Sequence, residues 1–123
     1  GNMLFVSGQI SQGSEGLVIG KLGSDLSLDD GYKAARLCGL ALIAQLRLAC
    51  NNDLSKLKRV VRLGGFVNCT NEFTDQPKII NGASDLMVEV FKEKGAHARA
   101  AVGSVSLPMG VAVEVDGIFE LIG

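Results

Sequence analysis

The stretch HARAAVGSVSLPMGVAVEVDG, residues 97 to 117, decides the fold that we predict for this chain. It is typical of two short strands, about residues 98–105 and 111–122, on either side of a turn at SLPMG. The first strand carries one arginine, Arg99, among small and apolar residues. A guanidinium keeps its charge at any ordinary pH and is costly to bury without a partner. Arg99 is therefore either half of a structural ion pair or the anchor of an anionic ligand.

The spacing within the two strands predicts what surrounds Arg99. Strict alternation places Ala101 and Gly103 on its face, and such small residues leave the space beside the guanidinium unfilled. If the strands pair in antiparallel fashion through the turn, Glu114 lies close to opposite Arg99 on the same face. A cross-strand ion pair is one interpretation. In the other, Arg99 binds a substrate carboxylate through two hydrogen bonds and Glu114 activates a water as a general base.

The rest of the chain predicts two helices and three more strands. One helix has Ser27, Asp29 or Asp30 as its possible N-cap and runs for about six turns. A second contains Pro77 in its first turn and stops at Gly95. The Gly64-Gly65 pair indicates a bulge or a close backbone approach within a strand. The segments expected as strands are 4–10, 17–23 (forming a hairpin with the first), 57–69, 98–105 and 111–122.

The order β-β-α-β-α-β-β predicts an α+β fold with two helices packed on one face of a mixed sheet of about five strands. The other sheet face is then bare. Because 47% of the residues are hydrophobic and the mean hydropathy is +0.30, we expect this face to pack against another copy of the chain.

Composition disfavours several classes of function. The net charge is −1, with no Trp and one Tyr, so nucleic-acid binding is not expected. The single histidine, His97, argues against a histidine metal cluster and a histidine-based triad, and we expect it to be partly exposed rather than catalytic. No apolar run approaches the roughly 20 residues that cross a bilayer. Without a secretory signal, and with three unpaired cysteines expected, the predicted location is the cytoplasm.

Three segments resemble the Rid family of reactive intermediate deaminases, formerly called YjgF. They are GNMLFVSGQI (1–10), RVVRLGGFVNCT (59–70) and HARAAVG followed by LPMGVAVEV near the end of the chain. The resemblance implies a chorismate-mutase-like fold, one domain over residues 1–123, and a homotrimer whose sheets line a central barrel. It also implies ligand sites in the clefts between subunits. The INGASDLMVEVF segment indicates a branch distinct from the best-studied members, and we expect the family's N-terminal segment to be missing.

The resemblance implies hydrolysis of enamines or imines such as 2-aminoacrylate to 2-keto acids and ammonia, with no cofactor and no metal. By this resemblance Arg99 pairs with the substrate carboxylate, and Glu114 is associated with the water or the leaving amine. Ala101 stands where many members have Cys, Ser or Thr, which leaves a more apolar floor. The other residues that the resemblance places near the ligand are Ser7, Gly8 and Asn81.

Three functions remain open at this point. The first is an enamine or imine deaminase. The second is a module that binds small carboxylates such as 2-keto acids without chemistry. The third, an endoribonuclease activity often ascribed to relatives, is disfavoured by the single histidine and the absence of a basic surplus.

Overall fold

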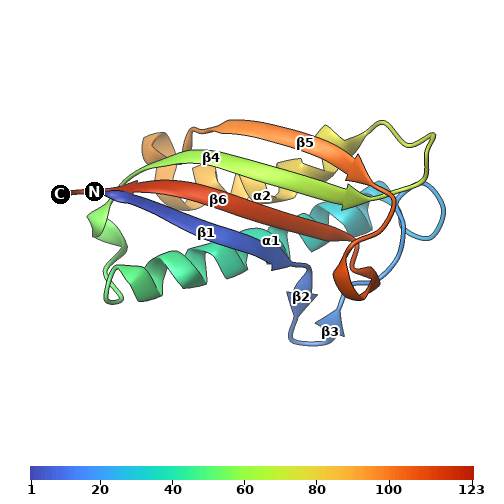
Figure 1. Ribbon diagram of the computed structural model, residues 1–123, viewed down its shortest axis with the longest axis horizontal. Helices are drawn as coiled ribbons and strands as arrows, with labels where there is room; N and C mark the ends of the chain where they lie inside the picture. Colours follow the sequence, from blue (N-terminus) through green and yellow to red (C-terminus); the bar gives the residue numbers. More distant parts are fainter.

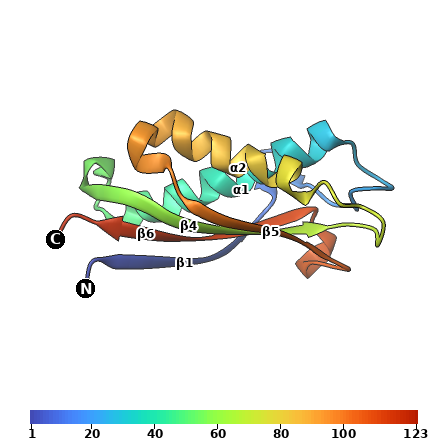
Figure 2. The same ribbon diagram turned by 90° about the horizontal axis from the view of Figure 1, so that it is seen from above.

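The computed structural model describes residues 1–123, with two helices packed on one face of a mixed sheet (Figures 1 and 2). The strand order is β1-β6-β4-β5, in which β4 and β5 are parallel and the other two pairs are antiparallel. The predicted fold class is confirmed. The elements are β1 (Met3–Ile10), β2 (Gln12–Gly13), β3 (Gly16–Leu17), α1 (Leu28–Ala49), β4 (Leu57–Asn68), α2 (Gln76–Phe91), β5 (Ala98–Ser104) and β6 (Val113–Leu121).

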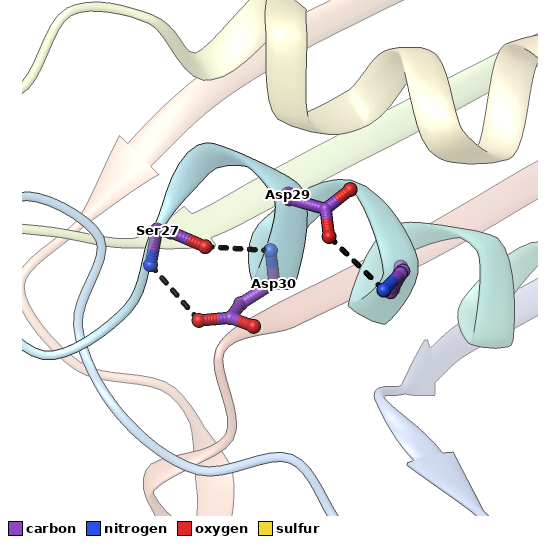
Figure 3. A network of polar contacts seen from close by, with 4 residues as sticks. Ser27, Asp29 and Asp30 are labelled. Carbon is purple, nitrogen blue, oxygen red and sulfur yellow. Dashed lines mark hydrogen bonds and ion pairs between the residues drawn. The ribbon is translucent and has the colours of Figure 1, made fainter.

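Helix α1 begins after Ser27, one of the three possible N-caps in the sequence, and Ser27 forms a reciprocal cap with Asp30. The Ser27 hydroxyl accepts a hydrogen bond from the Asp30 amide at 3.1 Å, and the Ser27 amide donates to the Asp30 carboxylate at 3.0 Å (Figure 3). Asp29 pairs with Lys33 at 3.0 Å one turn later. The hydrogen bonds from Ser27 lower the pKa of Asp30, so the cap carries a negative charge at the helix N-terminus, where the dipole favours it.

The core lies between the helices and the sheet. Gly65 on β4 makes the predicted close approach, because an added Cβ would lie 2.6 Å from the Ile80 side chain of α2. The strand irregularities fall earlier in β4, between Leu57 and Arg59 and between Val60 and Arg62. The largest buried side chains include Leu42 and Leu46 of α1, Ile80 and Met87 of α2, and Leu63, Val67 and Phe119 of the sheet.

The strand predicted at 17–23 is wrong. The chain forms instead a short separate hairpin of β2 and β3, and the main sheet has four strands. Gly20 and Gly23 have φ angles of +133° and +96°, which an extended strand does not contain. Between them Leu22 is fully buried, and its amide donates to the Asn68 carbonyl at 2.9 Å.

The predicted pairing of the last two strands is also wrong. Strand β5 pairs in parallel with β4, and β6 pairs with the opposite edge of β4. The segment between them contains a short 3-10 helix, Pro108–Gly110, instead of a hairpin turn. The cause is the β4-α2-β5 crossover, because a helix between two strands brings the second strand back parallel to the first.

The sheet face away from the helices is bare in one chain (Figure 2). It carries Phe5, Phe66 and Val102, which are 71%, 36% and 47% exposed. An ion pair between Arg62 and Asp116, with 3.9 Å between its charged atoms, lies on the same face. Neither helix is long and apolar enough to cross a membrane.

Candidate functional site

Arg99 lies on the edge strand β5 and directs its side chain toward α2. Its Nη1 donates to the Asn81 Oδ1 at 2.7 Å and to the Ser84 Oγ at 3.2 Å. No carboxylate forms an ion pair with it. Asn81 and Ser84 are three residues apart and so share one face of α2. Two neutral oxygens therefore orient the guanidinium through hydrogen bonds to its Nη1 atom. The hydrogens on Nε and Nη2 have no partner in the chain.

The guanidinium lines an open groove of about 320 Å³ beside the second helix. Its lining combines one cation, one carboxylate and one imidazole: Ser84, Asp85, Val88, Ala96, His97 and Arg99. A larger groove of about 430 Å³ between β1 and α1 includes Ser7, but no charged side chain lines it. Of these two grooves, only the smaller one has charged side chains and an imidazole in its lining.

His97 is partly exposed, as the sequence predicts, and it lies within hydrogen-bond distance of Ser84. The imidazole is half-buried; its Nδ1 lies 2.6 Å from the Gly95 carbonyl oxygen and its Nε2 lies 2.9 Å from the Ser84 Oγ. Ser84 itself was not predicted. Its spacing of three from Asn81, which places both side chains on one face of α2, is the signal that could have located it.

Ala101 lies on the same strand face as Arg99, as predicted. It is half-buried and packs against the hydrophobic core. Further along, an added Cβ on Gly103 would lie 2.8 Å from the Cys69 sulfur. The strand beyond Ala101 is therefore closed to larger side chains at Gly103, beside the Cys69 sulfur and the Gln76 amide.

Ser7, Gly8 and Glu114 form a second cluster. The pairing of β1 with β6 shifts between Val6 and Gln9, so Ser7 and Gly8 form a bulge. A Cβ on Gly8 would overlap the Glu114 carboxylate, at 2.1 Å from Oε2. The carboxylate therefore rests against the bulged backbone, and glycine is the residue that leaves room for it.

The two clusters lie on opposite faces of the sheet. Arg99 is opposite the fully buried Leu63 on the helix side, and Glu114 is opposite the exposed Phe66 on the bare side. Strand β4 lies between their two strands, so the strands are two spacings, or about 10 Å, apart. Along the strand direction, their positions differ by three residues, or about 10 Å. The predicted cross-strand pair of Arg99 and Glu114 is therefore wrong within one chain.

The Cys38 thiol of α1 packs against β6, where its sulfur lies 3.5 Å from the Val113 carbonyl oxygen. Burial, and secondarily the negative charge of Glu114, raises the pKa of Cys38 from 9.0 to about 12. Cys38, Cys50 and Cys69 are all unpaired and buried. A thiol with such a pKa stays protonated and is a poor nucleophile. The chain has no group of three or more His, Cys, Asp or Glu side chains arranged to hold a metal ion.

Comparison with known proteins gives consistent matches over the whole chain. The family model described as "YjgF/chorismate_mutase-like, putative endoribonuclease" matches residues 1–120. Protein TCP17 of Trypanosoma cruzi is 47% identical over 123 residues, covering 98% of this chain and 76% of that protein.

Two solved structures are similar throughout. The protein Atu1372 of Agrobacterium tumefaciens, described as having unknown function, is 46% identical with a TM-score of 0.97, over 99% of this chain and 77% of that one. A Shewanella oneidensis protein described as "a putative endoribonuclease" is 38% identical with a TM-score of 0.93, over 98% of this chain and 80% of that one.

Proposed function

Since this chain belongs to the YjgF/chorismate-mutase-like family, also called the Rid family, we propose that it hydrolyses small carboxylate-bearing enamines or imines to 2-keto acids and ammonia. The observation that carries the proposal is the state of Arg99. Asn81 and Ser84 hold its Nη1, no acidic side chain neutralises it, and the hydrogens on Nε and Nη2 are free. These two nitrogens form the planar fork that binds a carboxylate through two parallel hydrogen bonds.

The chemistry follows from where Arg99 holds the ligand. In 2-aminoacrylate and its imine tautomer, the carbon that water attacks is bonded directly to the carboxylate. Fixing the carboxylate on Arg99 therefore fixes the reacting carbon beside the groove, which reduces the entropic part of the barrier. The same site would release the product 2-keto acid, which keeps the carboxylate.

The opposite placement of Arg99 and Glu114 supports a site built from two copies of the chain. In the proposed homotrimer, Arg99 of one subunit faces Ser7, Gly8 and Glu114 of the next, and Glu114 positions the attacking water. The exposed aromatic and aliphatic side chains on the bare sheet face support such an assembly, because apolar patches of this kind mark interaction surfaces.

The second candidate is a binding module for 2-keto acids. The open groove and the methyl group of Ala101, which supplies no hydroxyl or thiol beside Arg99, favour it. An endoribonuclease remains the least favoured, because the net charge of −1 offers little attraction for a polyanion.

One pair of measurements separates the first two candidates. Binding of 2-oxobutyrate is measured by calorimetry, and ammonia release is measured from 2-aminoacrylate generated in situ by a serine dehydratase. A deaminase both binds and accelerates ammonia release over the uncatalysed rate. Binding without acceleration contradicts the proposed activity and identifies the chain as a binding module.

A further inference from the structure

The hydrogen bonds of His97 define which nitrogen carries its proton. The Gly95 carbonyl can only accept a hydrogen bond, so the Nδ1 atom at 2.6 Å from it must be the donor. In the neutral imidazole Nε2 then has no hydrogen, and it accepts the hydroxyl hydrogen of Ser84 across 2.9 Å. The Ser84 oxygen accepts in turn from Arg99 at 3.2 Å. A backbone carbonyl, an imidazole, a hydroxyl and a guanidinium are thus joined in one directed chain of hydrogen bonds.

We propose that Ser84 and His97 form a proton relay for the ligand that Arg99 holds. This inference rests on the proposed deaminase function and adds to it an acid–base group from the same chain as Arg99. Ser84 and His97 line the groove together with the guanidinium. A hydroxyl bonded to an imidazole, with that imidazole oriented by a third group, is the arrangement that moves protons in many hydrolases.

The other charged groups of the groove leave the imidazole as the group that can pass a proton to and from Ser84. Arg99 from β5 and Asp85 from α2 are the charged residues that line the groove with His97. An arginine does not release its proton. The Asp85 carboxylate accepts a hydrogen bond from the Tyr32 hydroxyl of α1 at 2.7 Å and is engaged there. His97 is therefore the group in the groove that can accept a proton at one ring nitrogen and return it, and it supplies the relay.

The relay acts first as a base and then as an acid. Water attacks the imine carbon of a protonated imine; the carbon–oxygen bond forms and the C=N π electrons move to nitrogen. The water proton passes to the Ser84 oxygen while the Ser84 proton passes to His97 Nε2. The imidazolium then returns a proton through Ser84 to the amine. The carbon–nitrogen bond breaks, ammonia departs with its electron pair and takes the remaining hydroxyl proton, and the products are a 2-keto acid and ammonium.

The relay residues belong to the same chain as Arg99, whereas Glu114 belongs to a neighbouring copy. Ser84 and His97 reach the Arg99 ligand from within one chain, whereas Glu114 reaches it only from another copy. In the proposed cleft the relay therefore borders one side of the ligand, and Glu114 of the neighbouring subunit borders the other.

The first test uses the wild-type protein, because the chain has one histidine and its imidazole nitrogens give unambiguous ¹⁵N NMR signals. The relay predicts that the neutral ring is protonated on Nδ1 and not on Nε2. A neutral ring protonated on Nε2 overturns the relay.

The second test is kinetic. His97→Gln and Ser84→Ala should each lower kcat for ammonia release about 100-fold or more, the usual contribution of general acid–base catalysis. The Kd for 2-oxobutyrate should change little, because the shorter hydrogen bond of Arg99, to Asn81, remains in both variants. Ser84→Thr keeps the hydroxyl and should recover most of the rate, and added imidazole should partly rescue His97→Ala. Glu89→Gln, on the same helix and paired with Arg36 away from the groove, is the control.

The outcomes separate the two proposals. Wild-type turnover that survives both His97→Gln and Ser84→Ala overturns the relay and leaves the deaminase function standing. Loss of 2-oxobutyrate binding in parallel with turnover would give these residues a structural role and also overturns the relay. No turnover by the wild type overturns the proposed function, and with it the role of the relay in deamination.

Discussion

Arg99 and Glu114 lie on opposite faces of the sheet, on strands that β4 separates. A guanidinium and a carboxylate placed in this way cannot hold one small molecule between them within a single chain. Each has its own support instead: Arg99 is oriented by Asn81 and Ser84, and Glu114 rests against Gly8. The proposed activity therefore depends on two copies of the chain.

Mixing two inactive variants tests this dependence. In the proposed homotrimer, Arg99→Ala and Glu114→Gln should each be inactive when refolded alone. After the two are unfolded and refolded together, about a quarter of the clefts should combine an intact Arg99 with an intact Glu114 from the neighbouring subunit. We expect about that fraction of wild-type ammonia release. Each variant refolded alone is the control, and the absence of any recovered activity in mixed trimers would place the site within one chain.

Gly8→Ala is expected to displace the Glu114 carboxylate. The added methyl carbon would overlap the side chain at 2.1 Å from Oε2, and the end of a flexible side chain can move away at small cost in stability. We predict a midpoint of urea unfolding close to that of the wild type and a clear loss of kcat. Gly13→Ala, which adds the same methyl carbon but meets only Leu37 side-chain carbons at 3.2 Å and beyond, is the matched comparison. Full activity in Gly8→Ala would show that the position of Glu114 is not important.

Gly82→Ala is expected to separate the two helices. Its Cβ would lie 2.0 Å from the Tyr32 carbonyl oxygen, and backbone atoms cannot turn aside as a side chain can. We predict a loss of about 1–3 kcal/mol or more in the free energy of unfolding, as for other overpacked positions. Gly13→Ala, whose Cβ would meet only Leu37 side-chain carbons at 3.2 Å and beyond, should cost less. Equal stability of the two variants would contradict the close helix crossing.

Cys38 should make the protein less stable at high pH. Burial raises the pKa of this thiol to about 12 in the folded chain, from 9.0. Between these values the unfolded chain has lost the proton and the folded chain has kept it. The free energy of unfolding should therefore fall as the pH rises above 9, by up to about 1.4 kcal/mol per pH unit.

Urea unfolding under reducing conditions at pH 8.5, 9.5 and 10.5 measures this slope. Other groups titrate in the same range, so the informative quantity is the difference between the wild type and Cys38→Ala. The variant should lose less stability over these two pH units. The same slope in both proteins would show that the Cys38 thiol ionises as readily in the folded chain as in the unfolded one.

The fold could be predicted from local patterns, and its strand pairing could not. Ser27 and Asp30 have the spacing of a helix cap, and the helix begins there. The SLPMG segment resembled a hairpin turn because strands joined by a short loop usually pair with each other. Here the crossover through α2 brings β5 to one edge of β4, so β6 pairs with the other edge. Which strands become neighbours depends on the connections of the whole sheet, and a local sequence pattern does not predict it.

Arg99 and Asn81 were predicted as candidate site residues, whereas Ser84 was not. Arg99 was recognisable as a charge among apolar residues, and Asn81 lies beside it as the family resemblance implied. Ser84 was not predicted, and His97 was expected to be partly exposed rather than catalytic, because a serine in a helix and a histidine just before a strand are ordinary when considered separately. Only the packing of α2 against β5 brings the hydroxyl within 2.9 Å of the imidazole.

The most direct test of the central claim compares ammonia release from in situ 2-aminoacrylate by the wild type and by Arg99→Ala, with both shown to be folded and of the same oligomeric mass. Truncation removes the partner of the substrate carboxylate, which costs 2 kcal/mol or more, or at least about 30-fold in kcat/KM. We predict acceleration by the wild type and little or none by Arg99→Ala. Equal acceleration by the two proteins would contradict the claim that Arg99 anchors the substrate.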